Sequence, residues 1–479
     1  MRDALKHLTG ESLVYGLGQV SGRAVQLLLV PVLTRALARD VYGVADLVLA
    51  YSQFAVLVLV FGMDAALVRF FYQEPDRQAR RRMVASSLAF RVLAALAAAA
   101  LLAWLAEPLS QRLVGSPAYR KYVWIGAATL PFSLLVLFAN DVLRVTFQPW
   151  KFIALNLVQT VAITAVSLWL VLDRGLGVAG VLYGKLAGDT LCAGLGLLLI
   201  RPSLAPRVDR GVLSRMLRYG FPLVPASIAY GVVSSADRYF LQRTRGLAEV
   251  GVYAVAVKFF AVVMMGVSAF SLAFFPFAHA RSGSPEAPRL YARAMALYVA
   301  CASLVALLVG SFAPEALTLL APPAYREAAL PALVLTFAAV AYGAYYVSCL
   351  GIQLSLRTPL LGWTALAAAF VAVAANLVLT PRLGMLGAAA ATFVGNVGLA
   401  VFTYAASQRV HPLPYRGLRL ALLFALGLGL AFFAQRLGPS GAVGWALKLG
   451  AAVAFAAAAW KLEVWRDRGA VRPIETRGT

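Results

Sequence analysis

The stretch LGVAGVLYGKLAGDTLCAGLGLLLI, residues 176–200, decides the fold class of this chain. Lys185 and Asp189 are its only charged residues, and their spacing of four lets them neutralise each other on one face of a helix. A helix of about 20 mainly apolar residues crosses the hydrocarbon core of a bilayer, which is about 30 Å thick. The stretch therefore predicts a membrane-spanning helix.

Similar apolar runs recur along nearly the whole chain of 479 residues, of which 61% are hydrophobic and 13% charged. Soluble domains carry roughly 25% charged residues, so this composition cannot cover a water-exposed surface. The chain is thus predicted to be an all-α integral membrane protein with about fourteen transmembrane helices, divided at clusters of charged residues, Pro and Gly. The expected spans are 12–34, 41–63, 84–106, 121–143, 152–172, 177–200, 219–241, 249–275, 293–313, 328–352, 359–380, 384–406, 418–436 and 442–461.

The net charge of +23 is explained by orientation in the membrane. With a cytoplasmic N-terminus and an even number of spans, the cytoplasmic segments hold 26 Lys and Arg and the external loops hold 11. This asymmetry follows the positive-inside rule, and basic clusters such as 80–82 also contact anionic lipid head groups. We therefore expect both termini in the cytoplasm, membrane lipids as partners and no nucleic-acid partner.

Two pairs of matching segments indicate an internal repeat. The first pair is LGVAG at 176–180 and LGMLG at 383–387. Seven residues separate LGVAG from Gly188-Asp189, and seven residues separate LGMLG from Gly395-Asn396. Asp40-Val41 with Ala45 likewise matches Glu249-Val250 with Ala254. Six helices per repeat make the two copies parallel, related by an axis along the membrane normal. The expected domains are an N-terminal six-helix lobe (1–205), a C-terminal six-helix lobe (206–410), and helices 13 and 14 with a cytoplasmic tail (411–479).

Catalytic chemistry is not expected. The three cysteines lie inside apolar runs without the spacing of a metal site or a disulfide framework, and the chain has no GxxxxGK[ST] loop for a nucleotide. We predict no enzyme activity, no metal and no cofactor. The first apolar run lacks a small-residue cleavage site and is interpreted as a retained helix.

Charged residues deep inside the spans are the first candidates for a site. Arg23, Arg91, Lys185 and Lys258 lie seven or more residues from the ends of their spans. Each would cost about 2.5–3.5 kcal/mol if it faced lipid at the bilayer centre. We expect them to face a protein-lined, watery interior.

Two of the expected helices carry polar stripes. On the first, Ser12, Gly16, Gln19, Arg23 and Gln26 are spaced by three or four and share one face. The seventh span carries Ser227, Ser234, Asp237 and Arg238 toward its outer half. These are equivalent helices of the two repeats, so the stripes are expected to face each other across the axis.

Simpler interpretations compete for several of these charges. Lys185 and Asp189 can neutralise one another, Asp237 and Arg238 can form a pair at a helix end, and Arg91 can snorkel toward the cytoplasmic face. Arg23 and Lys258 have no partner nearby in the sequence, which favours a functional role for them.

The balance of charge inside the spans suggests the substrate. The deep cations suit an anion, because Arg matches phosphate oxygens and Lys serves as a point charge for them. We predict an anion site in a central cavity from Arg23, Lys258, Arg91 and Arg238, with Gln19 and Gln26 beside them. Acidic residues within the spans are few, and Asp46, Asp189 and Asp237 are the candidates for ion coupling.

Several short segments resemble one family of membrane proteins. YGFPLVP at 219–225, SADRY at 235–239 and EVGVY at 249–253 resemble the seventh and eighth helices of bacterial polysaccharide transporters, the O-antigen flippases (Wzx-like). PVLTRAL at 31–37, followed by Asp40, is similar to the turn between their first two helices. This family belongs to the multidrug/oligosaccharidyl-lipid/polysaccharide exporter superfamily, which also contains multidrug and toxin extruders and the lipid II flippase. The resemblance covers the whole chain in helix number, spacing and repeat.

The resemblance implies an alternating-access carrier of the bacterial inner membrane. Its implied substrate is an undecaprenyl-diphosphate-linked oligosaccharide, moved from the cytoplasmic to the outer leaflet for polysaccharide biosynthesis. The implied partners are this lipid-linked sugar, membrane lipids and other polysaccharide assembly proteins. Arg23 and Lys258 lie on suitable helices to engage the diphosphate. An ion-coupled multidrug or cation exporter, a lipid II flippase and a membrane polymerase or ligase remain open as alternatives.

Overall fold

The all-α membrane fold is confirmed. A computed structural model describes residues 29–281, 283–355, 357–437 and 441–462. Within these ranges, twelve helices are long and apolar enough to cross a membrane. The long helices are α2 (Arg39–Leu59), α4 (Arg77–Trp104), α6 (Arg120–Val145), α7 (Pro149–Leu172), α8 (Gly177–Ile200), α10 (Val224–Arg245), α11 (Leu247–Ala280), α12 (Ala287–Ser311), α14 (Ala329–Leu354), α15 (Pro359–Leu383), α16 (Met385–Val410), α17 (Gly417–Leu437) and α18 (Ala442–Lys461).

Short helices occupy some segments expected to be loops. Between α2 and α4 lies α3 (Met63–Gln73), which begins after a sharp turn at Gly62, where φ is +64°. Asp76 then caps α4, because its carboxylate accepts hydrogen bonds from the backbone N–H groups of Gln78 and Ala79. The α4 helix therefore starts seven residues before the expected span at 84. Further short elements are α5 (Ala106–Leu109), η1 (Ser110–Val114), η2 (Pro117–Tyr119), η3 (Arg201–Ser203), α13 (Ala313–Leu320) and η5 (Pro323–Ala328).

The expected span 219–241 is displaced from the observed long helix at both ends. Its first residues form the end of α9 (Arg210–Gly220) and the turn η4 (Phe221–Leu223), and the long helix α10 continues to Arg245. The α10 helix is not among the twelve apolar helices because its second half, SSADRYFLQRTR, is polar. Asp237 thus lies well inside a helix, and not near its outer end as the sequence suggested.

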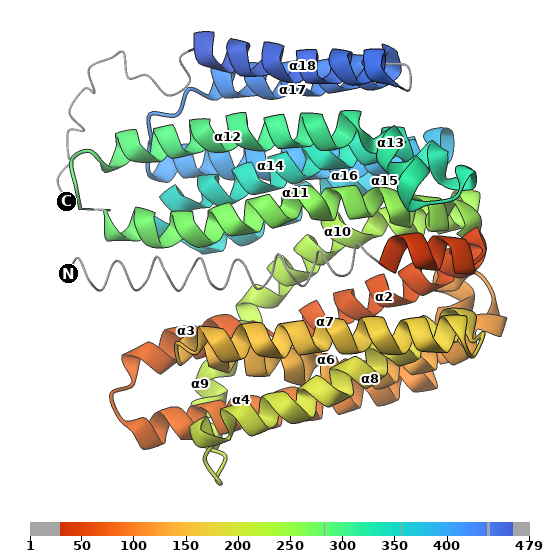
Figure 1. The fold of residues 1–479 in the computed structure, drawn as a ribbon. Helices are drawn as coiled ribbons and strands as arrows, with labels where there is room; N and C mark the ends of the chain where they lie inside the picture. Colours follow the sequence, from red (N-terminus) through yellow and green to blue (C-terminus); the bar gives the residue numbers. More distant parts are fainter. Residues whose placement is uncertain (1–28, 282, 356, 438–440, 463–479) are drawn as a thin grey trace.

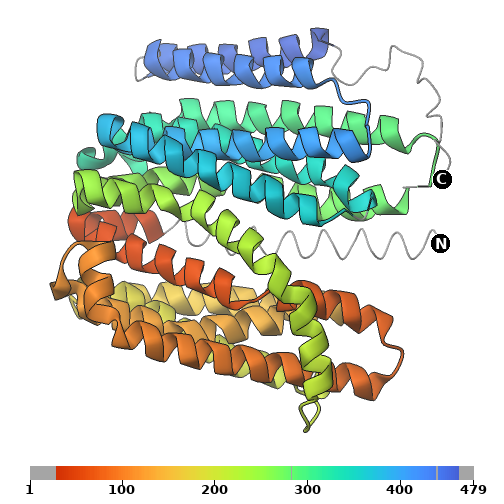
Figure 2. The same ribbon diagram turned by 180° about the vertical axis from the view of Figure 1, so that it is seen from behind.

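Figure 1 shows the helices in two groups. The helices α3, α4, α6, α7, α8 and α9 form the lower group, and α11 to α16 form the upper one, with α17 and α18 packed on its far side. Between the groups, α2 and α10 run obliquely side by side (Figures 1 and 2). Any cavity bordered by these two helices therefore lies where the two groups meet.

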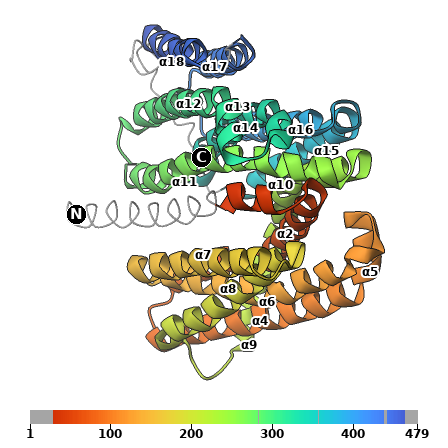
Figure 3. The ribbon, with the colours of Figure 1, turned by 45° about the vertical axis from the view of Figure 1, so that its right-hand side comes forward.

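The two groups are joined at the end of the molecule that carries α5 and α13 (Figure 3). There α2 crosses α11 at Gly43 and Gly251, where a Cβ atom on either glycine would collide with the backbone of the other helix. Thr34 Oγ1 lies 3.3 Å from the Leu320 carbonyl oxygen, and a buried apolar cluster includes residues of both groups, among them Val114 and Tyr253. This end of the interface is closed.

The structure strengthens the case for an internal repeat. Gly177 and Gly384, which occupy the same position in the two LGxxG segments, both have positive φ, at +53° and +58°. Each makes a tight turn into the following helix, a conformation that glycine adopts without steric cost. PAYR also occurs twice, at 117–120 and 323–326, and both copies form a short 3₁₀ turn before a long helix. We propose that the six-helix lobes of the expected domains correspond to these repeats.

Candidate functional site

The α10 helix separates two cavities. Its residues 230, 233, 234, 237 and 238 line one cavity of about 490 Å³, and residues 231, 232, 235, 236 and 239 line another of about 540 Å³. Both sets follow the three- and four-residue spacing of one helix face. The α2 helix also borders both, through Leu57 on one side and Phe54 on the other.

The first cavity, here called the tyrosine cavity, is polar at one end. A buried cluster of charges forms this end, in which Arg238 Nε lies 2.8 Å from Asp46 of α2 and Arg238 Nη1 lies 3.3 Å from Asp237. The second carboxylate oxygen of Asp237 accepts hydrogen bonds from Tyr253, at 2.6 Å, and from Thr392, at 3.1 Å. These contacts satisfy the buried Arg238 and join α2 to α10 across the interface between the two groups.

The other wall of this cavity is aromatic. Tyr342, Tyr345 and Tyr346 are spaced along one face of α14 and meet Tyr230 of α10. Neighbouring ring centroids lie 5.2–5.7 Å apart, and Tyr342 and Tyr346 meet at an interplanar angle of 85°. The hydroxyls of Tyr230 and Tyr345 are hydrogen-bonded to each other. The cavity thus presents both ring faces and hydroxyl groups.

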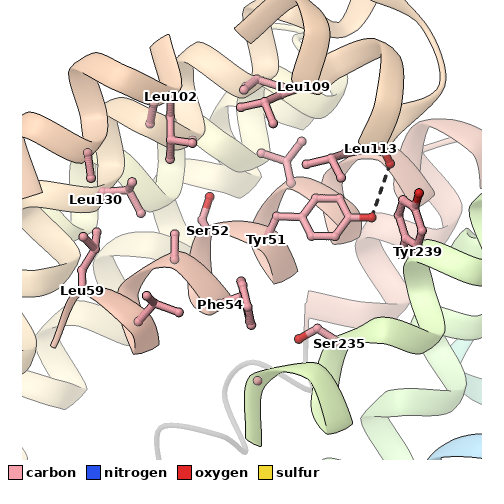
Figure 4. A pocket seen from close by; sticks show the side chains of 18 of the residues that line it. Tyr51, Ser52, Phe54, Leu59, Leu102, Leu109, Leu113, Leu130, Ser235 and Tyr239 are labelled. Carbon is pink, nitrogen blue, oxygen red and sulfur yellow. Dashed lines mark hydrogen bonds between the residues drawn. The ribbon is translucent and has the colours of Figure 1, made fainter. Parts of the chain in front are cut away.

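The second cavity, here called the apolar pocket, is built from α2, α4, α5, η1, α6 and α10 (Figure 4). Leucine, valine and alanine side chains make most of its wall, and Ser52 and Ser235 are small polar exceptions. Tyr51 lies at one edge, where its hydroxyl donates a 3.4 Å hydrogen bond to the Leu113 carbonyl oxygen. Such a surface accommodates hydrocarbon and offers little to an ion.

Two other buried ion pairs lie inside the lower group and line neither cavity. Arg91 is 1% exposed and pairs at 2.9 Å with Asp141, which also contacts Arg144. Arg91 is therefore buried in protein and does not snorkel to the surface. Lys185 pairs with Asp189 at 2.8 Å, as the sequence suggested, and Asp189 also contacts Ser133 and Gln159.

Lys258 differs from these paired charges. It is half-buried on α11 and makes no hydrogen bond or ion pair with any residue that the structure describes. Its neighbour Val257 lines the tyrosine cavity, whereas Lys258 itself does not. Arg23, Gln19 and Gln26 lie outside the described residues, so the structure brings together Asp46, Asp237 and Arg238 out of the predicted set. The roles assigned to all these residues stay predictions.

Among the residues of the tyrosine cavity, sequence reasoning considered Tyr345 as a contact for sugar rings but missed Tyr230, Tyr342, Tyr346 and Asn396. The spacing 342, 345, 346 was a visible signal, but tyrosines at helical spacing are common in packed cores. Asn396 had already appeared in the repeat as the counterpart of Asp189, and in the structure it lines the tyrosine cavity. No group of His, Cys, Asp and Glu suited to a metal ion occurs among the described residues.

Comparison with known proteins gives the family and the fold. The model of the polysaccharide biosynthesis protein family matches residues 8–280. No curated protein sequence matches. Among solved structures, the lipid II flippase MurJ in an inward closed conformation is similar, with 12% identity and a TM-score of 0.73 over 93% of this chain and 98% of that one.

Other similar structures are transporters of the MOP superfamily. An outward-facing multidrug resistance MATE family transporter has 14% identity and a TM-score of 0.61, over 87% of this chain and 96% of that one. A MOP superfamily transporter from Pyrococcus furiosus, described as having a binding pocket of reverse polarity, has 13% identity and a TM-score of 0.56, over 86% and 96%. The TM-scores show that these proteins share a fold with this chain. Sequence identities this low do not show that they share a substrate. The chain therefore belongs to the polysaccharide biosynthesis protein family and has the all-α membrane fold of the MOP superfamily.

Proposed function

We propose that this protein is a flippase for undecaprenyl-diphosphate-linked oligosaccharides. It carries the lipid-linked sugar from the cytoplasmic to the outer leaflet of a bacterial inner membrane, with both chain termini in the cytoplasm, and performs no covalent chemistry. The similarity to the lipid II flippase MurJ supports a lipid-linked substrate. The family match supports a role in polysaccharide biosynthesis.

The observation that carries the proposal is the pair of cavities on the two faces of α10. One is polar and aromatic and the other is almost wholly apolar. A water-soluble drug or cation needs only the first, whereas a lipid with a sugar head group needs both. The head group would occupy the tyrosine cavity, and the isoprene units nearest the diphosphate would lie against the apolar pocket. Each is within the size range of about 300–1,000 Å³ typical of ligand sites.

Lys258 is the proposed contact for the diphosphate. It has no counter-ion among the residues that the structure describes, and its helix borders the tyrosine cavity through Val257. A half-buried ammonium group without a counter-ion is available to a phosphate oxygen, which forms a charge-assisted hydrogen bond with it. Arg23, with Gln19 and Gln26, is proposed to complete the site from the first helix.

Transport would follow from rocking of the two helix groups about the site. The closed end, where Gly43 and Gly251 meet, would be the outer gate, because the positive-inside rule assigns the loops at that end to the outside. The proposed cycle alternates between this form, closed at the outer gate, and a second form in which the outer gate opens. The carboxylates Asp46, Asp189 and Asp237 remain candidates for coupling the cycle to an ion.

The test is mass spectrometry of polyprenyl-linked lipids from cells that lack the protein. Accumulation of an undecaprenyl-diphosphate oligosaccharide on the cytoplasmic side, reversed by the wild-type gene, would support the proposal. Accumulation of lipid II alone would assign the protein to lipid II transport. If no lipid-linked sugar accumulates and the cells become sensitive to cationic drugs, the flippase proposal is wrong.

A further inference from the structure

Within the proposed function, we infer that the tyrosine cavity is a saccharide subsite and that it selects sugars without negative charge. The inference rests on three independent features of this cavity: a buried amide without a partner, a corner of aromatic rings, and the sign of its fixed charge.

Asn396 provides the first feature. Its side chain lines the cavity, is 3% exposed and makes no hydrogen bond with any described residue. An amide has two N–H donors and an acceptor oxygen, and here these groups reach the cavity with their hydrogen bonds unused. A ligand with adjacent donors and acceptors can bind them, and the vicinal hydroxyls of a sugar have that pattern.

The internal repeat shows that Asn396 and its counterpart in the first half have different surroundings. Asp189 and Lys185 are the counterparts of Asn396 and Thr392, each 207 residues earlier. In the first half, Lys185, Ser133 and Gln159 bind Asp189 and fill the space around it. In the second half, Thr392 donates instead to Asp237 and leaves Asn396 facing the cavity. The two equivalent positions therefore differ, because three side chains bind Asp189 whereas Asn396 faces the cavity.

The tyrosines provide the second feature. Tyr342 and Tyr346 are half-buried, and their rings meet almost at a right angle, with centroids 5.2 Å apart. A pyranose ring has an apolar face of C–H groups and a rim of hydroxyls. An aromatic side chain with an apolar body and a polar tip complements both. The corner formed by Tyr342 and Tyr346 can cover one ring face while a tyrosine hydroxyl reaches its rim.

Charge provides the third feature. Among the described residues that line this cavity, Arg238 is the only cation, and it is bound by both Asp46 and Asp237. The three side chains together have one more negative than positive charge. A carboxylated sugar in the cavity would be repelled, whereas a neutral or amino sugar would not. The diphosphate is assigned to Lys258, outside the cavity lining, so the head group is divided between an anion site and a subsite for uncharged sugar.

Binding to the purified full chain in lipid nanodiscs tests the inference with three probes. These are undecaprenyl diphosphate, the same lipid bearing a neutral N-acetylhexosamine–hexose disaccharide, and a third lipid in which the hexose is a hexuronic acid. We expect the neutral disaccharide to tighten binding about tenfold over the bare lipid, equal to about 1.4 kcal/mol. The hexuronic acid should give a smaller gain.

Two variants on different helices test whether the gain in affinity from the disaccharide arises in the tyrosine cavity. Asn396→Leu on α16 and Tyr342→Leu on α14 should each reduce binding of the neutral glycolipid to that of the bare lipid. Tyr183→Leu is the matched control, because Tyr183 is 43% exposed on α8 and lines neither cavity. The inference is overturned if the disaccharide adds no affinity in the wild type, or if both variants retain the gain. Equal or tighter binding of the hexuronic acid lipid would overturn the charge selectivity. Failure of all three lipids to bind would overturn the proposed function as well.

Discussion

Gly43 of α2 and Gly251 of α11 occupy equivalent positions at the crossing that closes one end of the molecule. A Cβ atom on Gly43 would collide with the Leu247 carbonyl oxygen, and one on Gly251 would collide with the Arg39 carbonyl oxygen. Gly251 lies 208 residues after Gly43, and Leu247 lies 208 residues after Arg39. The two contacts are therefore equivalent. The two backbones can approach this closely only because neither position has a side chain. The crossing is therefore a symmetric closure between the two halves of the repeat.

The first prediction concerns this closure. Gly251→Leu should prevent the closed end from forming, because the new side chain overlaps the backbone of α2 and overpacking costs about 1–3 kcal/mol or more. The readout is disulfide formation between Thr34→Cys and Leu320→Cys, which lie on the two sides of the closed end. The background for all these variants replaces the three native cysteines with Ala.

Wild type is expected to cross-link rapidly in the absence of substrate, and the Gly251→Leu variant more slowly by about tenfold. Gly266→Leu on the same helix is the matched control, because a Cβ there meets nothing within 4 Å. Unchanged cross-linking in Gly251→Leu would show that this crossing does not hold the end closed.

The second prediction concerns Asp46 and Arg238. Their ion pair joins α2 to α10, and Arg238 retains Asp237 as a second partner when Asp46 is removed. Asp46→Ala should therefore weaken the closed end without unfolding the protein. A double-mutant cycle with Arg238→Gln, measured by thermal unfolding, should give a coupling energy of about 0.5–3 kcal/mol. A coupling energy near zero would mean that the pair does not hold the two helices together.

The third prediction concerns Lys258. Lys258→Gln should weaken binding of undecaprenyl diphosphate by about tenfold, since a charged hydrogen bond contributes about 1.5–3 kcal/mol, whereas Lys258→Arg should retain most of the affinity. The measurement is lipid binding in nanodiscs at low and high salt, because salt screens an exposed ionic contact. Lys461→Gln, at an exposed helix end, serves as the charge control. Equal affinities of Lys258→Gln and Lys461→Gln would remove Lys258 from the site.

The fourth prediction separates a structural ion pair from a functional one. Lys185→Ala leaves Asp189 buried with Ser133 and Gln159 as its remaining partners, and should lower the midpoint of thermal unfolding. Lys185→Met combined with Asp189→Leu should restore much of the stability, because apolar replacement of a buried pair is often neutral. Transport per folded molecule should be unchanged in the double variant. Loss of transport at full stability would instead support Asp189 as an ion-coupling residue.

The helices could be predicted from the sequence because the bilayer imposes a length and an apolar composition on each span. The bounds 177–200 and 442–461 agree with α8 and α18. The family resemblance also came from local segments, and the family match confirms it. The hydropathy signal was lost at α10, because the second half of this helix is polar.

Of the candidate site, the sequence by itself determined which charges interrupt the apolar runs and that Lys185 can reach Asp189, because both follow from positions along one helix. Only the tertiary structure decided that Arg238 binds Asp46, 192 residues away, and that Arg91 binds Asp141. It also placed Tyr230, Tyr342 and Asn396 around one cavity. A membrane span has the same composition whichever neighbour it contacts, so the partner of each polar face is set by helix packing alone.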